Sequence, residues 1–174
     1  MNQSEKRLFL IQSLLNERPS CQKQSIPSDP ERQKILLRGL MNVRRPAHIG
    51  TEFLQVQDEY LQNETAAKGI TDIAELTPMQ PGLYLWQGDI TTLKCDAIVN
   101  AANSGMTGCY IPNHRCIDNA IHTFAGVELR LACGELMERQ GYPEPTGQAK
   151  ITPAFNLPCR YVLHTVGPII SGRV

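Results

Sequence analysis

Up to about residue 77, apolar positions recur at helical spacing, which predicts three helices. The first ends before Pro19, because proline cannot continue a helix. The second begins after the N-cap candidate Asp29, with Pro30 at its first position. The third closes at Gly69, and one further helical turn is expected over 71–76. The apolar stripes, of which the second is expected to be buried, are Leu8, Ile11, Leu14 and Leu15; Ile35, Leu36, Leu37, Leu40 and Met41; and Phe53, Leu54, Val56, Tyr60 and Leu61.

After the turn-rich stretch 78–82, short strand-like runs alternate with a helical pattern. Strands are predicted over 83–87, 97–100, 149–152 and 161–166, with one helix from about Ile117 through Arg139. This alternation predicts an α/β fold with a largely parallel central sheet. Ligands of such sheets bind beyond the carboxyl ends of the strands, so we expect a site in the loops after Gln87 and Asn100.

The pattern divides the chain into a helical N-terminal extension, residues 1–77, and an α/β domain, residues 78–174. Only Gly167 to Val174 follow the last predicted strand. That would leave one sheet face and one edge uncovered. We therefore expect the chain to be the N-terminal part of a longer protein, or a polypeptide that ends early.

Charge and composition argue against two classes of binding partner, nucleic acids and membranes. The chain has 17 basic and 17 acidic side chains, so no net field favours nucleic acid or a membrane surface. No apolar run approaches the roughly 20 residues that span a bilayer, and the N-terminus does not resemble a signal peptide. We expect a cytoplasmic protein that binds neither nucleic acid nor membrane. Arg44, Arg45 and His48 are interpreted as solvated surface without a role.

Six cysteines are too few and too scattered for a disulfide scaffold. Four stand alone and are interpreted as small core residues: Cys21, Cys95, Cys133 and Cys159. The other two, Cys109 and Cys116, share a loop with His114, and this donor set suits zinc. Three ligands would leave a coordination position for water or substrate. Their spacing is not a standard zinc pattern, so chance clustering is one competing interpretation. A cysteine nucleophile paired with His114 is the other.

Polar residues at two predicted strand ends also have two interpretations. Asp89 could accept hydrogen bonds from an exocyclic amine or cap the following turn. Asn100 and Asn103 could bind sugar hydroxyls or satisfy loop backbone.

Five motifs, in this order and at these spacings, resemble the macrodomain family. They are Gly-Asp-Ile-Thr at 88–91, Asp-Ala-Ile-Val-Asn-Ala-Ala-Asn at 96–103, Ile-Asp-Asn-Ala-Ile-His at 117–122, Thr-Gly-Gln-Ala-Lys-Ile-Thr at 146–152 and Tyr-Val-Leu-His-Thr-Val-Gly-Pro at 161–168. The resemblance implies a three-layer α/β/α fold with a mixed central sheet, incomplete at its C-terminus. Family members carry a further glycine-rich diphosphate loop and closing strands, which would lie beyond Val174.

The resemblance also implies ADP-ribose as ligand and assigns roles to individual residues. Asp89, with Ile90 beside it, would contact the adenine, and Asn103 the distal ribose, with Asn100 close by. Backbone amides of Ile117, Asn119 and Ala120 would bind the diphosphate at a helix N-terminus. Asp118 matches the aspartate of hydrolytic members, which makes Asp118 and Asn103 the candidate catalytic residues. His122, Lys150 and His164 occupy motif positions that look structural.

One departure identifies a subgroup. The run between Asn103 and Asp118 is longer than the usual glycine-rich run, and it contains Cys109, His114 and Cys116. It is similar to that of the microbial zinc-dependent macrodomains, which also have a helical N-terminal extension. This similarity implies a Zn²⁺-dependent hydrolase that removes mono-ADP-ribose from acidic side chains of modified proteins, in some bacteria linked to lipoylated carrier proteins. The alternatives are a non-catalytic ADP-ribose-binding module, an inactive fragment of the hydrolase, and a cysteine-dependent hydrolase.

Overall fold

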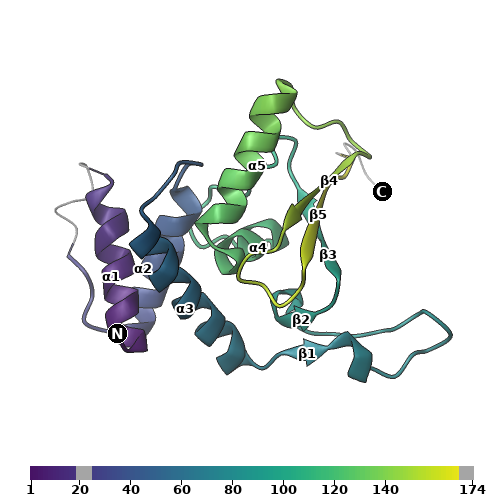
Figure 1. Ribbon diagram of the computed structural model, residues 1–174, viewed down its shortest axis with the longest axis horizontal. Helices are drawn as coiled ribbons and strands as arrows, with labels where there is room; N and C mark the ends of the chain where they lie inside the picture. Colours follow the sequence, from purple (N-terminus) through teal and green to yellow (C-terminus); the bar gives the residue numbers. More distant parts are fainter. Residues whose placement is uncertain (19–24, 169–174) are drawn as a thin grey trace, which may run out of the picture.

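A computed structural model describes residues 1–18 and 25–168, so the predictions for Pro19 and Cys21 lie outside the described residues. Figure 1 shows the N-terminal helices on one side of the molecule and a small sheet with its own helices on the other. The first three are α1 (Gln3–Asn16), α2 (Pro30–Val43) and α3 (Thr51–Lys68). The predicted caps are present: the Asp29 side chain accepts a hydrogen bond from the Arg32 N–H, and Gly69 ends α3.

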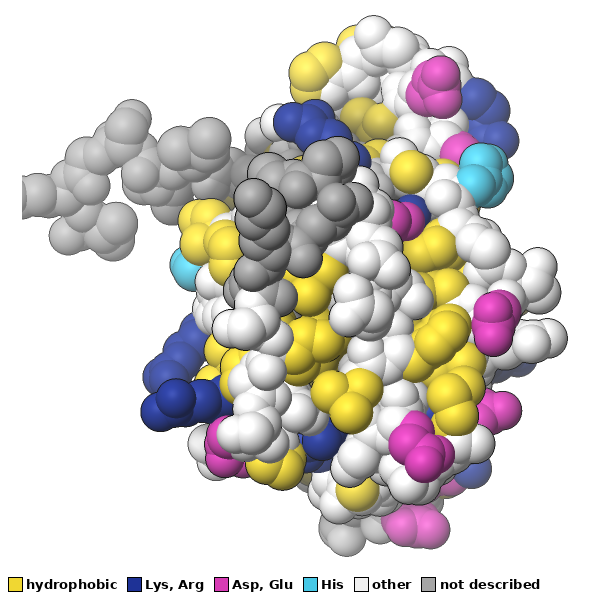
Figure 2. All heavy atoms as spheres, turned by 90° about the vertical axis from the view of Figure 1, so that its left-hand side faces the viewer, with side chains coloured by type: hydrophobic (Ala, Val, Ile, Leu, Met, Phe, Trp, Pro, Cys, Tyr) yellow, Lys and Arg dark blue, Asp and Glu magenta, His cyan; other side chains and the backbone are white. Residues whose placement is uncertain are grey.

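The helices α1 to α3 enclose a core of their own. Its central side chains, including Leu10, Ile11 and Tyr60, are at most 3% exposed. One part of the predicted buried stripe is wrong, because Ile35 is 58% exposed. Figure 2 shows the face formed by the N-terminal helices, where charged side chains of both signs surround the apolar ones.

The interpretation of Arg44 as solvated surface is also wrong. Arg44 is 6% exposed. Its Nε lies 2.7 Å from Glu17 Oε2, and its guanidinium also donates to the carbonyls of Ala47 and His48. These contacts tie the end of α2 to α1. Arg45 and His48 are exposed, as expected.

The main sheet has the strand order β3-β5-β4, with β3 (Ala97–Ala102), β4 (Ala149–Pro153) and β5 (Tyr161–Val166). β3 and β5 are parallel and β4 is antiparallel to β5, so the sheet is mixed. One face packs on α4 (Ile117–Ala125) and α5 (Val127–Gln140). Within the described residues no helix covers the other face, where Val99 and Ile151 are more than half exposed.

Two predictions within the sheet domain fail. Residues 83–87 form no strand: the chain turns at Pro81 and Gly82, makes a single bridge between Gln80 and Leu83, and continues exposed. A strand needs a neighbour, and this segment finds none among the described residues. The pairing close to it is instead between β1 (Thr71–Asp72) and β2 (Leu93–Lys94). A 3₁₀ turn, Ile73–Glu75, occupies the predicted helical turn over 71–76.

The predicted helix over 117–139 is two helices that meet at Gly126. Gly126 has φ +96°, a conformation that side chains disfavour, and a Cβ there would lie 2.6 Å from Gln57 Nε2. Gln57, from α3, accepts a hydrogen bond from the Val127 N–H through Oε1 at 2.9 Å. A side chain 70 residues away in sequence therefore completes this helix break.

Candidate metal centre and ligand-binding edge

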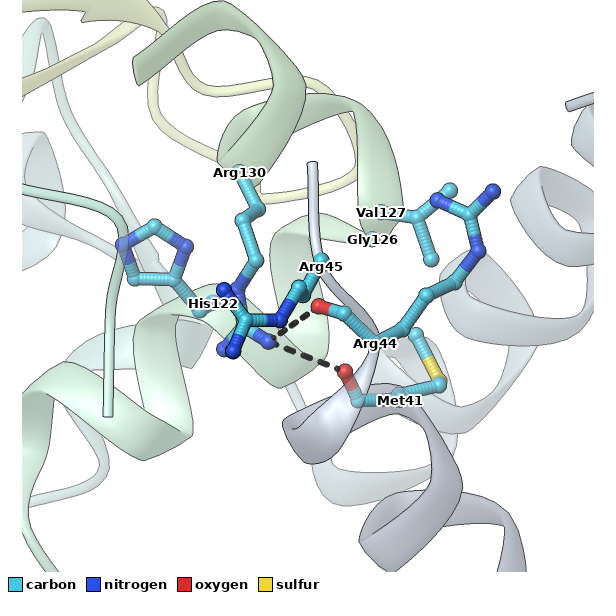
Figure 3. Close-up of a pocket in the computed structure, with 7 residues that line it drawn as sticks. All are labelled: Met41, Arg44, Arg45, His122, Gly126, Val127 and Arg130. Atoms are coloured by element: carbon cyan, nitrogen blue, oxygen red, sulfur yellow. Dashed lines mark hydrogen bonds between the residues drawn. The ribbon is translucent and has the colours of Figure 1, made fainter. Parts of the chain in front are cut away.

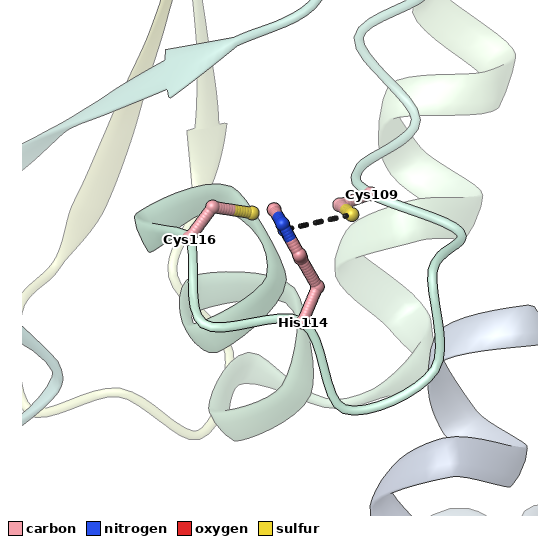
Figure 4. A group of neighbouring side chains, drawn as sticks. All are labelled: Cys109, His114 and Cys116. Carbon is pink, nitrogen blue, oxygen red and sulfur yellow. Dashed lines mark hydrogen bonds between the residues drawn. The ribbon is translucent and has the colours of Figure 1, made fainter.

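The loop that leads from β3 to α4 brings the three predicted metal ligands together (Figure 4). Cys109 Sγ lies 3.6 Å from His114 Nδ1, and Cys116 Sγ completes a group whose ligand atoms are all within 4.8 Å of one another. Tetrahedral zinc holds sulfur and nitrogen ligands about 3.5 Å apart. The donor types and their spacing therefore fit a zinc ion held by Cys109, His114 and Cys116.

Local interactions fix the end of this loop. Cys116 is the N-cap of α4, and its Sγ accepts a hydrogen bond from the Asn119 N–H at 3.4 Å. Burial raises the pKa of the Cys116 thiol. Gly108, at the start of the loop, has φ +84°, and a Cβ there would collide with the His122 ring. No carboxylate or amide in the described part of the chain contacts the His114 ring, so a cysteine nucleophile would lack an orienting group for its base.

Asp118 lies at the start of α4, 5% exposed. Asn100 donates to its Oδ1 at 2.8 Å, and Asn103 to its Oδ2 at 3.4 Å. Burial raises the pKa of this carboxyl group, and the contacts with Asn100, Arg130 and Asn103 oppose that shift. Asp118 does not belong to the Cys/His/Cys group. Asp118 lies in the helix α4, after the loop that carries the three candidate ligands.

Asn103 and Asn100 have different surroundings although they are three residues apart. Asn103 is exposed, and its side chain also accepts from the Gly105 N–H and donates to the Gly108 carbonyl. Asn100 is completely buried and contacts His164 Nδ1 at 3.1 Å. Asn103 is thus open to a ligand, whereas Asn100 is closed to solvent and donates a hydrogen bond to Asp118 from the core.

The N-terminus of α4 presents fewer free amides than the resemblance implies. The Asn119 N–H donates to Cys116 Sγ, and the Ala120 N–H donates to the Cys116 carbonyl at 3.1 Å. Among the described residues, the N–H groups of Ile117 and Asp118 have no acceptor. These two are the ones available to a diphosphate.

Asp89 caps a short 3₁₀ turn, Ile90–Thr92, as one of its two interpretations predicts. Its Oδ1 accepts from the N–H and the hydroxyl of Thr91, and its Oδ2 lies 3.1 Å from Lys68 Nζ. Burial raises the pKa of Asp89, but the contacts with Thr91 and Lys68 outweigh it, so the net shift is downward. The carboxylate is 45% exposed, so it can still receive a further donor.

A second group with ligand-like atoms lies beneath the sheet: His122, Cys133 and His164. The contacts of His164 favour a structural role for this group. His164 already contacts Asn100 through Nδ1 and Thr152 Oγ1 through Nε2 at 3.0 Å. Burial lowers the pKa of His164 to about 4 and raises that of Cys133 to about 12, and the Arg130 guanidinium adds positive charge nearby. We interpret this group as a neutral polar part of the core, in agreement with the structural roles predicted for His122, Cys133 and His164.

Arg130 is a site residue that the sequence analysis missed. It is 4% exposed, and its Nη1 donates to the carbonyls of Met41, Asn42 and Arg44 at the end of α2; Figure 3 shows two of these bonds. Its Nη2 donates to the Cys109 carbonyl at 3.2 Å. No local motif marks Arg130, because its partners lie 21 to 89 residues away.

Comparisons with known proteins bear on the family of the chain. A family profile described as Macro domain matches residues 99–173. Over 100% of its length the chain is 62% identical to a protein-ADP-ribose hydrolase of Treponema medium. It is 48% identical, over 93% of its length, to a protein-ADP-ribose hydrolase of Staphylococcus aureus strain MRSA252. It spans 68% and 61% of these two relatives.

A solved structure of the Trypanosoma brucei macrodomain in complex with ADP-ribose is 27% identical with a TM-score of 0.50. The match covers 82% of this chain and 61% of that one. The chain therefore belongs to the macrodomain family, as its motifs predict, and has the α/β macrodomain fold with a mixed sheet. No helix among the described residues is long and apolar enough to cross a membrane.

Proposed function

We propose that this chain belongs to a zinc-dependent hydrolase that removes mono-ADP-ribose from acidic side chains of modified proteins. The observation that carries the proposal is the meeting of Cys109, His114 and Cys116 immediately before the helix that presents Asp118. Two relatives, which match 100% and 93% of the chain, are named protein-ADP-ribose hydrolases.

The residues have separate tasks in this reaction. Asp89 and Ile90 would hold the adenine, the N–H groups of Ile117 and Asp118 the diphosphate, and Asn103 the distal ribose. Bound zinc would supply a Lewis acid that polarises a ribose hydroxyl or a water molecule. Asp118, held by Asn100 and Asn103, would orient that group and accept its proton. Water adds across the bond between ribose and carboxylate and gives ADP-ribose and the free acidic side chain.

The resemblance also suggests one modified protein on which the reaction takes place. We propose a cytoplasmic setting and, as one substrate, an ADP-ribosylated lipoylated carrier protein. The recognition of that carrier is independent of the chemistry above. It is tested separately, by comparing the rates of ADP-ribose release from the modified carrier and from other modified proteins.

The test measures ADP-ribose release from a protein modified on aspartate or glutamate. The chain is assayed as purified, after chelation and after zinc is restored, with the Treponema medium relative as positive control. We expect release that chelation abolishes and zinc restores. Cys116→Ser should lose turnover while the fold persists, whereas Cys95→Ser, outside the metal group, should keep it.

Three outcomes would contradict the proposal. Full turnover by Cys116→Ser would contradict the zinc mechanism. Turnover that resists chelators but not thiol alkylation would favour a cysteine-dependent hydrolase. Binding of ADP-ribose without release under any metal condition would favour a binding module in which Cys109, His114 and Cys116 only stiffen the loop.

A further inference from the structure

The loop with the three candidate ligands rests on α2, more than 60 residues earlier in the sequence. Arg38, on α2, donates from Nη2 to the His114 carbonyl at 3.1 Å. The same guanidinium donates to Asn119 Oδ1, at 2.9 Å from Nη2 and at 3.3 Å from Nε. One side chain of the helical segment thus holds a candidate ligand residue and the first turn of α4.

Asn119 passes this contact on to a second candidate ligand. It is fully buried, and its Nδ2 donates to the Ile111 carbonyl at 3.1 Å. Its own N–H donates to Cys116 Sγ. Arg38 therefore holds the side chain of Asn119, and the backbone N–H of Asn119 contacts the sulfur of Cys116.

Two further contacts join α2 to the loop. The Asn113 N–H, directly before His114, donates to Asn42 Oδ1 at 2.9 Å. Asn113 has φ +56°, a conformation that needs support from its surroundings. The third contact is Arg130, which bonds the last carbonyls of α2 and the carbonyl of Cys109. Arg130 thus holds Cys109 through its carbonyl. His114 is held through its own carbonyl and through its neighbour Asn113. Cys116 is held through Asn119.

We propose that α2 is a structural part of the metal site, and that Arg38 is the positioning residue that sets His114 and Cys116 in the geometry for zinc. The inference rests on the zinc site of the proposed function, but it concerns affinity for the ion rather than turnover. Residues that hold metal ligands reduce the freedom the ligands lose on binding, and their replacement typically weakens metal affinity about 10- to 100-fold.

The test measures zinc affinity of the full chain by competition with a chromophoric chelator, without substrate. Cobalt(II) absorption reports the ligand geometry in parallel. We expect Arg38→Gln to bind zinc about 10- to 100-fold more weakly and to change the cobalt spectrum. Arg38→Lys should restore part of the affinity, because lysine keeps the charge but cannot bridge two acceptors as a fork.

Arg32→Gln is the matched control, because Arg32 lies on α2, is exposed, and its side chain makes no hydrogen bond or ion pair within the described ranges. Its affinity should equal that of the unchanged chain. Circular dichroism and thermal unfolding show whether each variant is folded. Should Arg38→Gln not fold, Asn42→Ala tests the same helix through Asn113 and should also weaken zinc binding.

The outcomes separate the two proposals. Wild-type zinc affinity and cobalt spectra in the folded variants at Arg38 and Asn42 would overturn the positioning role and leave the proposed function intact. If the unchanged chain binds no zinc through Cys109, His114 and Cys116, the zinc mechanism fails, and the role of Arg38 fails with it.

Discussion

Arg130→Met tests whether one buried cation joins the N-terminal helices α1 to α3 to the part of the molecule that contains the sheet. The guanidinium donates to three carbonyls at the end of α2 and to the Cys109 carbonyl. Methionine keeps the unbranched apolar stem of the side chain but has no donor. It would leave these buried carbonyls without their partner, and a buried acceptor without a partner is costly.

The expected loss can be worked from these contacts. A hydrogen bond to a charged group contributes about 1.5–3 kcal/mol, but Nη1 shares its hydrogens among three acceptors. Burial of the cation, which lowers the pKa of Arg130, also costs stability and offsets part of the gain. We therefore expect a net loss of about 3 kcal/mol, the upper end of the range for a hydrogen bond to a charged group. For a chain of this size that corresponds to a fall in Tm of roughly 10 °C.

Urea unfolding followed by circular dichroism measures this difference as a lower midpoint at an unchanged m-value. Arg139→Met is the control, because Arg139 lies on the same helix and is exposed. A loss below about 1 kcal/mol, the range of ordinary surface changes, would refute the argument that Arg130 joins the two parts.

Two further predictions concern the network below Asp118. Asn100→Leu removes the 2.8 Å donor to Asp118 without touching an exposed surface. We therefore expect kcat for ADP-ribose release to fall about tenfold, equivalent to about 1.4 kcal/mol, with KM little changed. Steady-state kinetics with an unaltered kcat would contradict this. Burial lowers the pKa of His164 to about 4 from 6.5, so the unfolded chain takes up this proton at a higher pH than the folded chain. Stability should therefore fall as pH drops from 6.5 toward 4, by up to about 1.4 kcal/mol per pH unit from this group, and denaturation at several pH values should show a shallower dependence in His164→Gln.

Sequence patterns predict correctly the features that interactions between neighbouring residues form. The second helix begins at Pro30 because Asp29 caps it and proline suits the first position. The strands over 97–100, 149–152 and 161–166 were predicted from their apolar runs and are β3, β4 and β5. The three candidate ligands lie within eight residues of one another, from Cys109 to Cys116, so a short loop can gather them.

The failures share a cause in distant partners. The strand predicted over 83–87 has the right composition but no neighbour among the described residues. The helix over 117–139 lacks a proline, and the break at Gly126 depends on Gln57 of α3. Arg44 looked like surface because its partner Glu17 lies on another helix, 27 residues earlier.

The sequence by itself determined the family, the helices and strands with strong local signals, and the identity of the candidate ligands, because motifs, caps and apolar periods are properties of adjacent residues. Only the tertiary structure decided that Asn100 is buried next to Asp118, that Asn119 and Ala120 have no free backbone N–H, and that Arg38 and Arg130 hold the loop with the three candidate ligands. These facts depend on which polar atoms find partners when α2, α4, α5 and β3 pack together. Such partners are separated by up to 89 residues, and no local pattern encodes them.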